Sequence, residues 1–205
     1  MKILNSKRRV TVLVLAATAA LGVTALEAGA IGPDLPLRGS GTFCLSPDAE
    51  RTLAAQNVKL EPIAPATANG NCLTLPGSGI LKPDLSGGEL PLEGGMRFAT
   101  AEHRLDVTNL RIHIKLGEGS TSADVAQDNE TAQHLDFFRY PVSLDRVSFT
   151  PRTVDTANIP LKLATPGAEA FTKAFGPGTT AAHDPLFIFG GHSEITNPLG
   201  GLPRP

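Results

Sequence analysis

The segment from Gly94 to Leu116 contains the longest alternation of apolar and polar residues in the chain. Leu105 and Val107 alternate with polar residues, and after a one-residue slip at Asn109 the alternation resumes and continues to Leu116. A period of two places the apolar side chains on one face of a β-strand and the polar ones on the other. The segment therefore predicts a half-buried antiparallel strand, and the slip predicts a β-bulge that returns the apolar set to the core.

The rest of the chain repeats this pattern in shorter extended runs separated by Pro- and Gly-rich turns. Two short helices are expected to begin at Ser46-Pro47 and at Thr165-Pro166, where proline suits the first turn, and the Ser46 hydroxyl is placed to cap free amides of the first helix. The other expected strands lie at 39–45, 58–62, 72–75, 80–81, 90–92, 96–99, 120–126, 134–139, 142–149, 159–163 and 186–189. These elements predict an all-β fold, an antiparallel β-sandwich (immunoglobulin-like or related) with two short helices.

The N-terminal segment predicts export. A basic head is followed by an uncharged run from Val10 to Leu26 and then by Ala28-Gly29-Ala30, which together form the pattern of a signal peptide at 1–30. The alternative is an uncleaved membrane anchor, because the run approaches the length of a spanning helix. We expect an extended leader at 31–38, a single domain at 39–195 and a disordered tail at 196–205. The mature protein is expected to be secreted and extracellular, either free or associated with the cell surface.

The two cysteines, Cys44 and Cys72, are expected to form a disulfide because an exported chain meets an oxidising environment. The alternative is two free thiols. A bridge would close a loop of roughly thirty residues and stabilise the fold by about 3 to 4 kcal/mol.

Charge and aromatic content exclude some classes of partner. The formal net charge is −2, and removal of the basic N-terminal head makes the mature chain more acidic, so nucleic acid is not an expected partner. The chain has no Trp and one Tyr, which disfavours stacking platforms for sugars or single-stranded bases. Membrane contact is expected only through the signal peptide before cleavage. The expected partner is an unidentified cell-surface or extracellular ligand.

The five histidines show none of the close spacings that place two metal ligands on one helix face, so no metal site is predicted. His183 and His192 bracket the last expected strand and are the weak candidates for a ligand site, since loop residues at strand ends are where sites commonly form. No catalytic residue is predicted, because Gly77-Ser78-Gly79 lacks the G-x-S-x-G spacing of a nucleophile elbow. The chain is therefore expected not to be an enzyme.

The stretch from Gly94 to Ile114 resembles the HtaA-type domain of exported actinobacterial haem-uptake proteins. That family carries a pattern of the form G-x-V-R-F-x-G-H-x-G-x-L-D-L-T-x-x-x-x-R-I. The matching residues in this bacterial-looking chain are Gly95, Arg97, Phe98, His103 or its neighbours, Leu105, Asp106, Thr108 and Arg111. The resemblance implies an exported protein with an all-β fold, and it implies a function in haem uptake.

The chain departs from the family where the iron ligand is expected. Haem-binding members carry a Trp and an iron-ligating Tyr in the N-terminal region, but here that region, 44–57, has neither residue, and Tyr140 lies much later. The leading hypothesis is therefore a secreted non-enzymatic binding or structural interaction protein without a cofactor. The alternative is a haem- or metal-binding protein of the HtaA type that takes part in iron acquisition.

Overall fold

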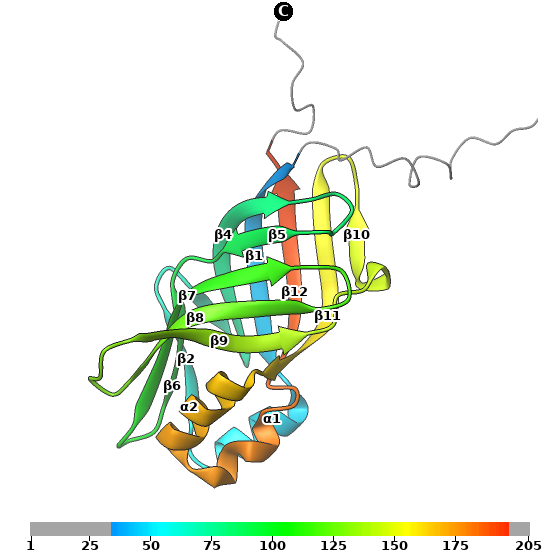
Figure 1. Cartoon of the computed structure of the whole chain (residues 1–205). Coiled ribbons are helices and arrows are strands. Elements are labelled where there is room, and N and C mark those ends of the chain that lie inside the picture. The colour runs from blue at the N-terminus through cyan, green and yellow to red at the C-terminus, as the bar shows by residue number, and fades with distance from the viewer. Residues whose placement is uncertain (1–33, 197–205) are drawn as a thin grey trace, which may run out of the picture. The chain divides into compact units, whose positions relative to one another are not determined.

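The computed structural model describes residues 34–196 (Figure 1). The strands are β1 (Leu35–Leu45), β2 (Lys59–Ile63), β3 (Thr67–Asn69), β4 (Cys72–Leu81), β5 (Gly88–Pro91), β6 (Gly95–Ala99), β7 (Arg104–Ile114), β8 (Gly119–Gln127), β9 (Gln133–Tyr140), β10 (Val147–Phe149), β11 (Thr153–Leu163) and β12 (Phe187–Ile195). The helices are α1 (Pro47–Ala55) and α2 (Thr165–Phe175), with 3₁₀ segments η1 (Leu144–Arg146) and η2 (Pro177–Ala182). The expected signal peptide at 1–30 lies outside the described residues, as does all of the expected tail except Thr196.

The antiparallel sheet closes on itself. Strands β7, β5, β4, β1, β12, β11, β9 and β8 pair in this order, and β8 pairs again with β7, which makes a barrel of eight strands. The β2–β6 pair extends from the first half of β7, while β3 and β10 each pair with one neighbour, β4 and β11. The all-β antiparallel prediction is thus confirmed, but one closed sheet replaces the two facing sheets of the expected sandwich. Alternation indicates which side chains face inwards, and it does not indicate whether the inner faces belong to one sheet or to two.

The bend in β7 is what allows this closure. The register between β7 and β8 shifts between Thr108 and Arg111, and Asn109 lies there with φ +51°, in the left-handed region. The bulge predicted at Asn109 is confirmed. It keeps Leu110 and Ile112 buried after the slip, and it lets one strand pair with β6 along its first half and with β5 along its second half.

The barrel interior beside the helices is filled by phenylalanines. The ring of Phe187 in β12 lies 5.9 Å from Phe43 in β1 and 5.8 Å from Phe138 in β9, measured between centroids. Phe171 of α2 joins this cluster through Phe98, at 4.9 Å. The buried rings anchor α2 to the barrel. Helix α1 lies at the same end of the barrel as α2 (Figure 1).

The disulfide expected from the sequence is present. Cys44 and Cys72 are direct partners in the β1–β4 register, and their sulfur atoms lie 2.04 Å apart. The bond joins β1, which precedes α1, to β4, which follows β3. It therefore links the two ends of the segment that contains α1, β2 and β3.

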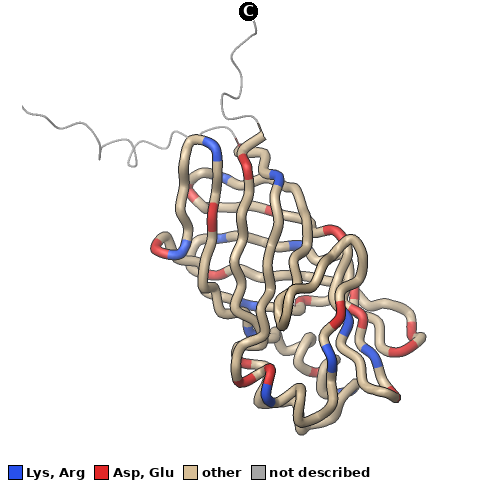
Figure 2. The backbone as a smooth tube through the Cα atoms, turned by 180° about the vertical axis from the view of Figure 1, so that it is seen from behind, with Lys and Arg blue, Asp and Glu red and all other residues tan. Residues whose placement is uncertain are grey.

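Lys and Arg positions are interspersed with Asp and Glu positions over the described backbone (Figure 2). No helix within residues 34–196 combines the length and the apolar character needed to cross a bilayer.

Candidate functional site

An open groove lies between the helices and the β6–β7 turn, with a volume of about 950 Å³. We call it the helix–turn groove. Its lining residues are Gln56, Asn57, Lys59, Glu61, Ala99, Thr100, Ala101, Glu102, His103, Lys173, Ala174, Phe175 and Gly176. These come from the ends of α1 and α2, the start of β2 and the turn between β6 and β7, so four separate segments meet there.

Local sequence explains where α1 begins and why both helices end at the groove. Ser46 caps α1 by accepting a hydrogen bond from the backbone N–H of Ala49 at 3.1 Å, and Pro47 occupies the first turn, as predicted. Asn57, with φ +55°, turns the chain out of α1 into β2. Gly176, with φ +79°, ends α2, as the sequence also predicted, because a left-handed residue after a helix favours glycine.

The β6–β7 turn is held by its own threonine. The Thr100 hydroxyl accepts hydrogen bonds from the backbone N–H of His103 at 3.0 Å and of Glu102 at 3.3 Å. The Thr100 backbone N–H donates to the carbonyl oxygen of His103 at 2.8 Å. These bonds fix the backbone that presents the His103 ring to the groove.

His103 is oriented by a carboxylate outside the groove. Its Nδ1 lies 3.3 Å from Asp128 Oδ2, while the other carboxylate oxygen accepts from the backbone N–H of Arg104 at 2.9 Å. The hydrogen bond from Arg104, with a smaller contribution from His103, lowers the pKa of Asp128. Within residues 34–196 no hydrogen bond involves His103 Nε2. One ring nitrogen held by a carboxylate, with the other available, is how proteins commonly orient a histidine that binds a metal.

The charged groups that line the groove are the cations Lys59 and Lys173 and the carboxylates Glu61 and Glu102. Lys173 Nζ lies 3.0 Å from Glu130 Oε2, and so α2 is tied to the loop after β8. Lys59 is exposed and forms no ion pair among the described residues. Ala99, Ala101 and Phe175 add apolar surface to the lining.

The two histidines nominated from the sequence have different surroundings. His183 packs its ring 5.4 Å from that of Phe171, burial lowers its pKa, and its buried Nε2 has no hydrogen-bond partner among residues 34–196. His192 lies on the outer face of β12, where its Nδ1 is 2.5 Å from Asp155 Oδ1. Neither ring lines the helix–turn groove, and within residues 34–196 no hydrogen bond joins the two rings.

The groove itself was not found by sequence reasoning. His103 was named only as part of the motif, and Asp128 was not named as a partner, because Arg104 and Asp128 are 24 positions apart in the chain. The expected β7–β8 hairpin is the signal that could have identified the pair. An antiparallel hairpin places the start of β7 beside the end of β8, and therefore His103 near Asp128. Within the described residues, no three His, Cys, Asp or Glu side chains are arranged to hold a metal ion.

Residues 53–187 match the family model described as Htaa, and this range covers more than half of the chain. The chain belongs to the HtaA family. The resemblance drawn from Gly94–Ile114 is therefore confirmed, and the motif residues occupy β6 and β7, next to the helix–turn groove. No curated protein matches the chain.

Solved structures of HtaA domains from Corynebacterium glutamicum share the fold. The C-terminal domain of HtaA has a TM-score of 0.59 and 13% identity, with 78% of this chain and 98% of that one covered. The N-terminal domain gives 0.53 and 11%, covering 78% and 97%. A domain-swapped dimeric variant of the C-terminal domain gives 0.50 and 17%, covering 68% and 85%. At these identities the likeness concerns the fold, and so the ligand must be argued from the residues of this chain.

Proposed function

We propose that this protein is an exported, non-enzymatic binding domain whose ligand is haem, held in the helix–turn groove with His103 as the iron ligand. The observation that carries the proposal is the His103–Asp128 pair, which presents a ring nitrogen at the groove. Family membership supports haem as the ligand, since haem uptake is what the resemblance implied. An imidazole would take the place of the tyrosine that the 44–57 segment lacks.

The other groups of the groove fit a flat, amphipathic ligand with carboxylates. Ala99, Ala101 and Phe175 offer apolar surface to a porphyrin face, and Lys59 offers a cation to a propionate. The bound group would supply an iron centre with a coordination position for an imidazole. The residues of this chain would orient and shield it, and Asp128 would keep the His103 ring in place.

Three histidines on this protein carry an aspartate partner, so the pairing alone does not define a site. His134 Nδ1 lies 2.8 Å from Asp124 Oδ1, and His192 lies beside Asp155. Only His103 among them also lines the groove. His134 is accordingly a matched control, because it is exposed and bound to an aspartate but does not line the groove.

The test is a titration of the purified mature protein with hemin, followed at the Soret band. We expect a stoichiometric, sharpened Soret band that His103→Ala abolishes, Asp128→Asn weakens and His134→Ala leaves unchanged. Loss on substitution of His183 or His192 instead would move the site to the residues nominated from the sequence. A titration with no change in the Soret band would refute haem binding and leave a surface interaction role without a cofactor.

A further inference from the structure

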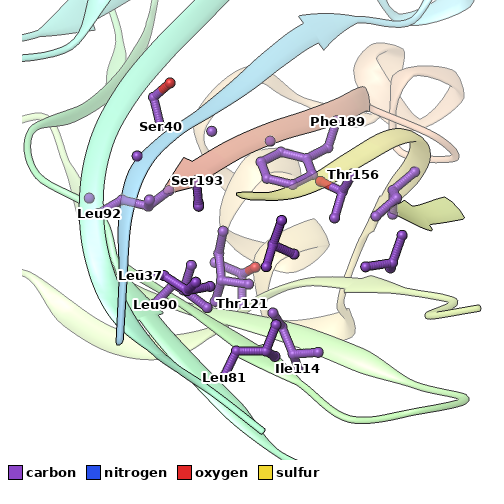
Figure 3. Close-up of a pocket in the computed structure, with 18 of the residues that line it drawn as sticks. Leu37, Ser40, Leu81, Leu90, Leu92, Ile114, Thr121, Thr156, Phe189 and Ser193 are labelled. Carbon is purple, nitrogen blue, oxygen red and sulfur yellow. The ribbon is translucent and has the colours of Figure 1, made fainter. Parts of the chain in front are cut away.

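A second cavity lies inside the barrel, separate from the helix–turn groove. Its volume is about 70 Å³, and we call it the lumen cavity. Its apolar lining residues include Leu37, Leu90, Leu92, Ile112, Val154 and Leu161, from four strands of the barrel and the start of the turn after β5. Figure 3 shows Phe189 and Thr156 facing Leu90, Thr121 and Ile114 across it.

Several glycines line this cavity, whereas phenylalanines fill the barrel beside the helices. Gly39, Gly41, Gly77 and Gly191 line the cavity from β1, β4 and β12. None of these positions supplies a side chain to the cavity lining. A Cβ on Gly39 would lie 2.0 Å from the carbonyl oxygen of His192, and one on Gly77 would lie 2.6 Å from that of Pro91, so neighbouring backbone packs closely at both glycines. The Phe189 ring packs directly against Gly41, since a Cβ on Gly41 would come within 2.7 Å of its Cε2 atom.

The polar groups that border the cavity are mostly satisfied elsewhere. The Tyr140 hydroxyl donates to the carbonyl oxygen of Ser120 at 2.8 Å, and Thr121 donates to the Tyr140 oxygen at 3.5 Å. Thr156 Oγ1 is buried without a hydrogen-bond partner among residues 34–196. The cavity therefore favours an apolar occupant over a chain of water molecules, each of which needs two or more polar partners.

An exposed apolar rim adjoins the cavity. Four large apolar side chains are exposed within residues 34–196, and three of them, Leu116, Leu144 and Phe149, flank residues of its lining. Phe149 pairs with the lining residue Val154 and shares the inner face of β10 with Val147. The backbone N–H of Leu116 donates to the carbonyl oxygen of Leu85, which lines the cavity. The backbone N–H of Gly117 donates to the carbonyl oxygen of Val142, another lining residue, which is two positions before Leu144 in the chain.

Size decides between classes of apolar ligand. An engineered protein cavity of about 150 Å³ accommodates benzene, so a cavity of about half that volume has room for the end of a slender chain and not for a ring system. Exposed apolar side chains beside it provide a surface for the part of the chain that stays outside. The rim carries both signs of charge, with Lys115 and Arg146 beside Asp145 and Glu118, and so it does not select a head group.

We infer that the lumen cavity binds the terminal segment of an unbranched hydrocarbon chain, such as that of a long-chain fatty acid, with the chain crossing the rim formed by Leu116, Leu144 and Phe149. This site is distinct from the proposed haem groove. Haem binding and chain binding can therefore succeed or fail independently of one another.

The test compares two tryptophan variants of adjacent residues with the unaltered mature protein. Val147→Trp places a large ring at the cavity mouth, while Ser148→Trp places the same ring on the opposite, exposed face of β10. The probe is cis-parinaric acid, a straight-chain fatty acid whose fluorescence rises in an apolar site. We expect saturable binding that Val147→Trp weakens by about tenfold or more, as the loss of two or more buried methylenes implies, and that Ser148→Trp leaves unchanged.

A second measurement keeps the proposal testable if Val147→Trp fails to fold. Stearate carrying ¹³C at its terminal methyl should give intermolecular NOEs to the methyl groups of Ile112 and Val154, and none to those of Leu53 in α1. The proposal is overturned if the unaltered protein does not bind the fatty acid, if both tryptophan variants bind it equally well, or if the terminal methyl of bound stearate gives no NOE to Ile112 or Val154. Cosedimentation with phosphatidylcholine vesicles without uptake of free fatty acid would also overturn it, because surface docking does not need the cavity.

Discussion

Arg97 and Asp106 are cross-strand partners in the β6–β7 hairpin and form a bidentate ion pair. Arg97 Nε lies 2.6 Å from Asp106 Oδ1, and Nη2 lies 2.8 Å from Oδ2. Both residues belong to the motif on which the HtaA resemblance was based. Their role is structural, since the pair locks the register of the hairpin whose turn presents His103.

Breaking this pair should destabilise the fold measurably. Asp106→Asn keeps the shape of the side chain but removes its charge and one strong acceptor, so we expect the free energy of unfolding to fall by about 1 kcal/mol. The side chain of Asp106 is 20% exposed, which limits screening by water. Urea unfolding measures the change. The control is Arg51→Gln in α1, whose ion pair with Asp48 is far more exposed and should contribute little; an equal effect of both variants would contradict the prediction.

Removing the Cys44–Cys72 bond should destabilise the protein more strongly. The bond closes a loop with a sequence separation of 28, and the unfolded chain gains conformational freedom when the bond is absent. We expect Cys44→Ala/Cys72→Ala to lower the free energy of unfolding by about 3 kcal/mol. Urea unfolding of the unaltered protein with and without reductant should reproduce the difference, and a reductant effect on the double variant would point to a cause other than the disulfide.

The sequence predicted local structure well where one residue type decides it. Ser46-Pro47 identified the start of α1, Gly176 the end of α2, and the alternation slip identified the bulge at Asn109. Each of these depends on chemistry within a few neighbouring residues, such as a capping hydroxyl or a left-handed backbone. Such features can be read without knowing which strands pair.

Closure of the barrel and both cavities depend on contacts between distant strands. The β7–β8 and β9–β11 pairings decide between a barrel and a sandwich, and the inward alternation of Leu37 and Phe43 is equally compatible with either. Gly39 and Gly41 have glycine partners in the neighbouring strands, Gly77 and Gly191. These cross-strand pairs depend on the register of strands that are distant in the sequence, so the sequence alone does not reveal them.

The bulge gives a direct test of backbone conformation. Asn109 has φ +51°, and its Nδ2 donates to Asp124 Oδ2 at 2.7 Å. We expect Asn109→Val to lower the free energy of unfolding by about 2 kcal/mol, because a β-branched residue is strained in the left-handed region. Asn109→Gly loses the same hydrogen bond but accepts the backbone angle, so it should cost about 1 kcal/mol or less. Equal losses for the two variants in urea unfolding would show that strain at this position is unimportant.

His183 should make the protein less stable in mild acid. Burial lowers the pKa of its ring, whereas in the unfolded chain the ring regains its ordinary value of about 6.5. The unfolded state therefore binds a proton more readily, and the free energy of unfolding should fall as the pH drops through about 6.5 towards the lower folded-state value. The carboxylates whose pKa is lowered, such as Asp124, act in a separate window below about pH 4.

Substitution of His183 by phenylalanine isolates this effect. His183→Phe keeps an aromatic ring against Phe171 and removes the buried, unpartnered Nε2. We expect the free energy of unfolding of the variant, measured in urea, to decline less between pH 7 and pH 5 than that of the unaltered protein. NMR titration of the His183 ring protons in the folded protein should give a pKa below about 6.5. Parallel pH profiles for the two proteins would mean that protonation of His183 is not what lowers stability over this range.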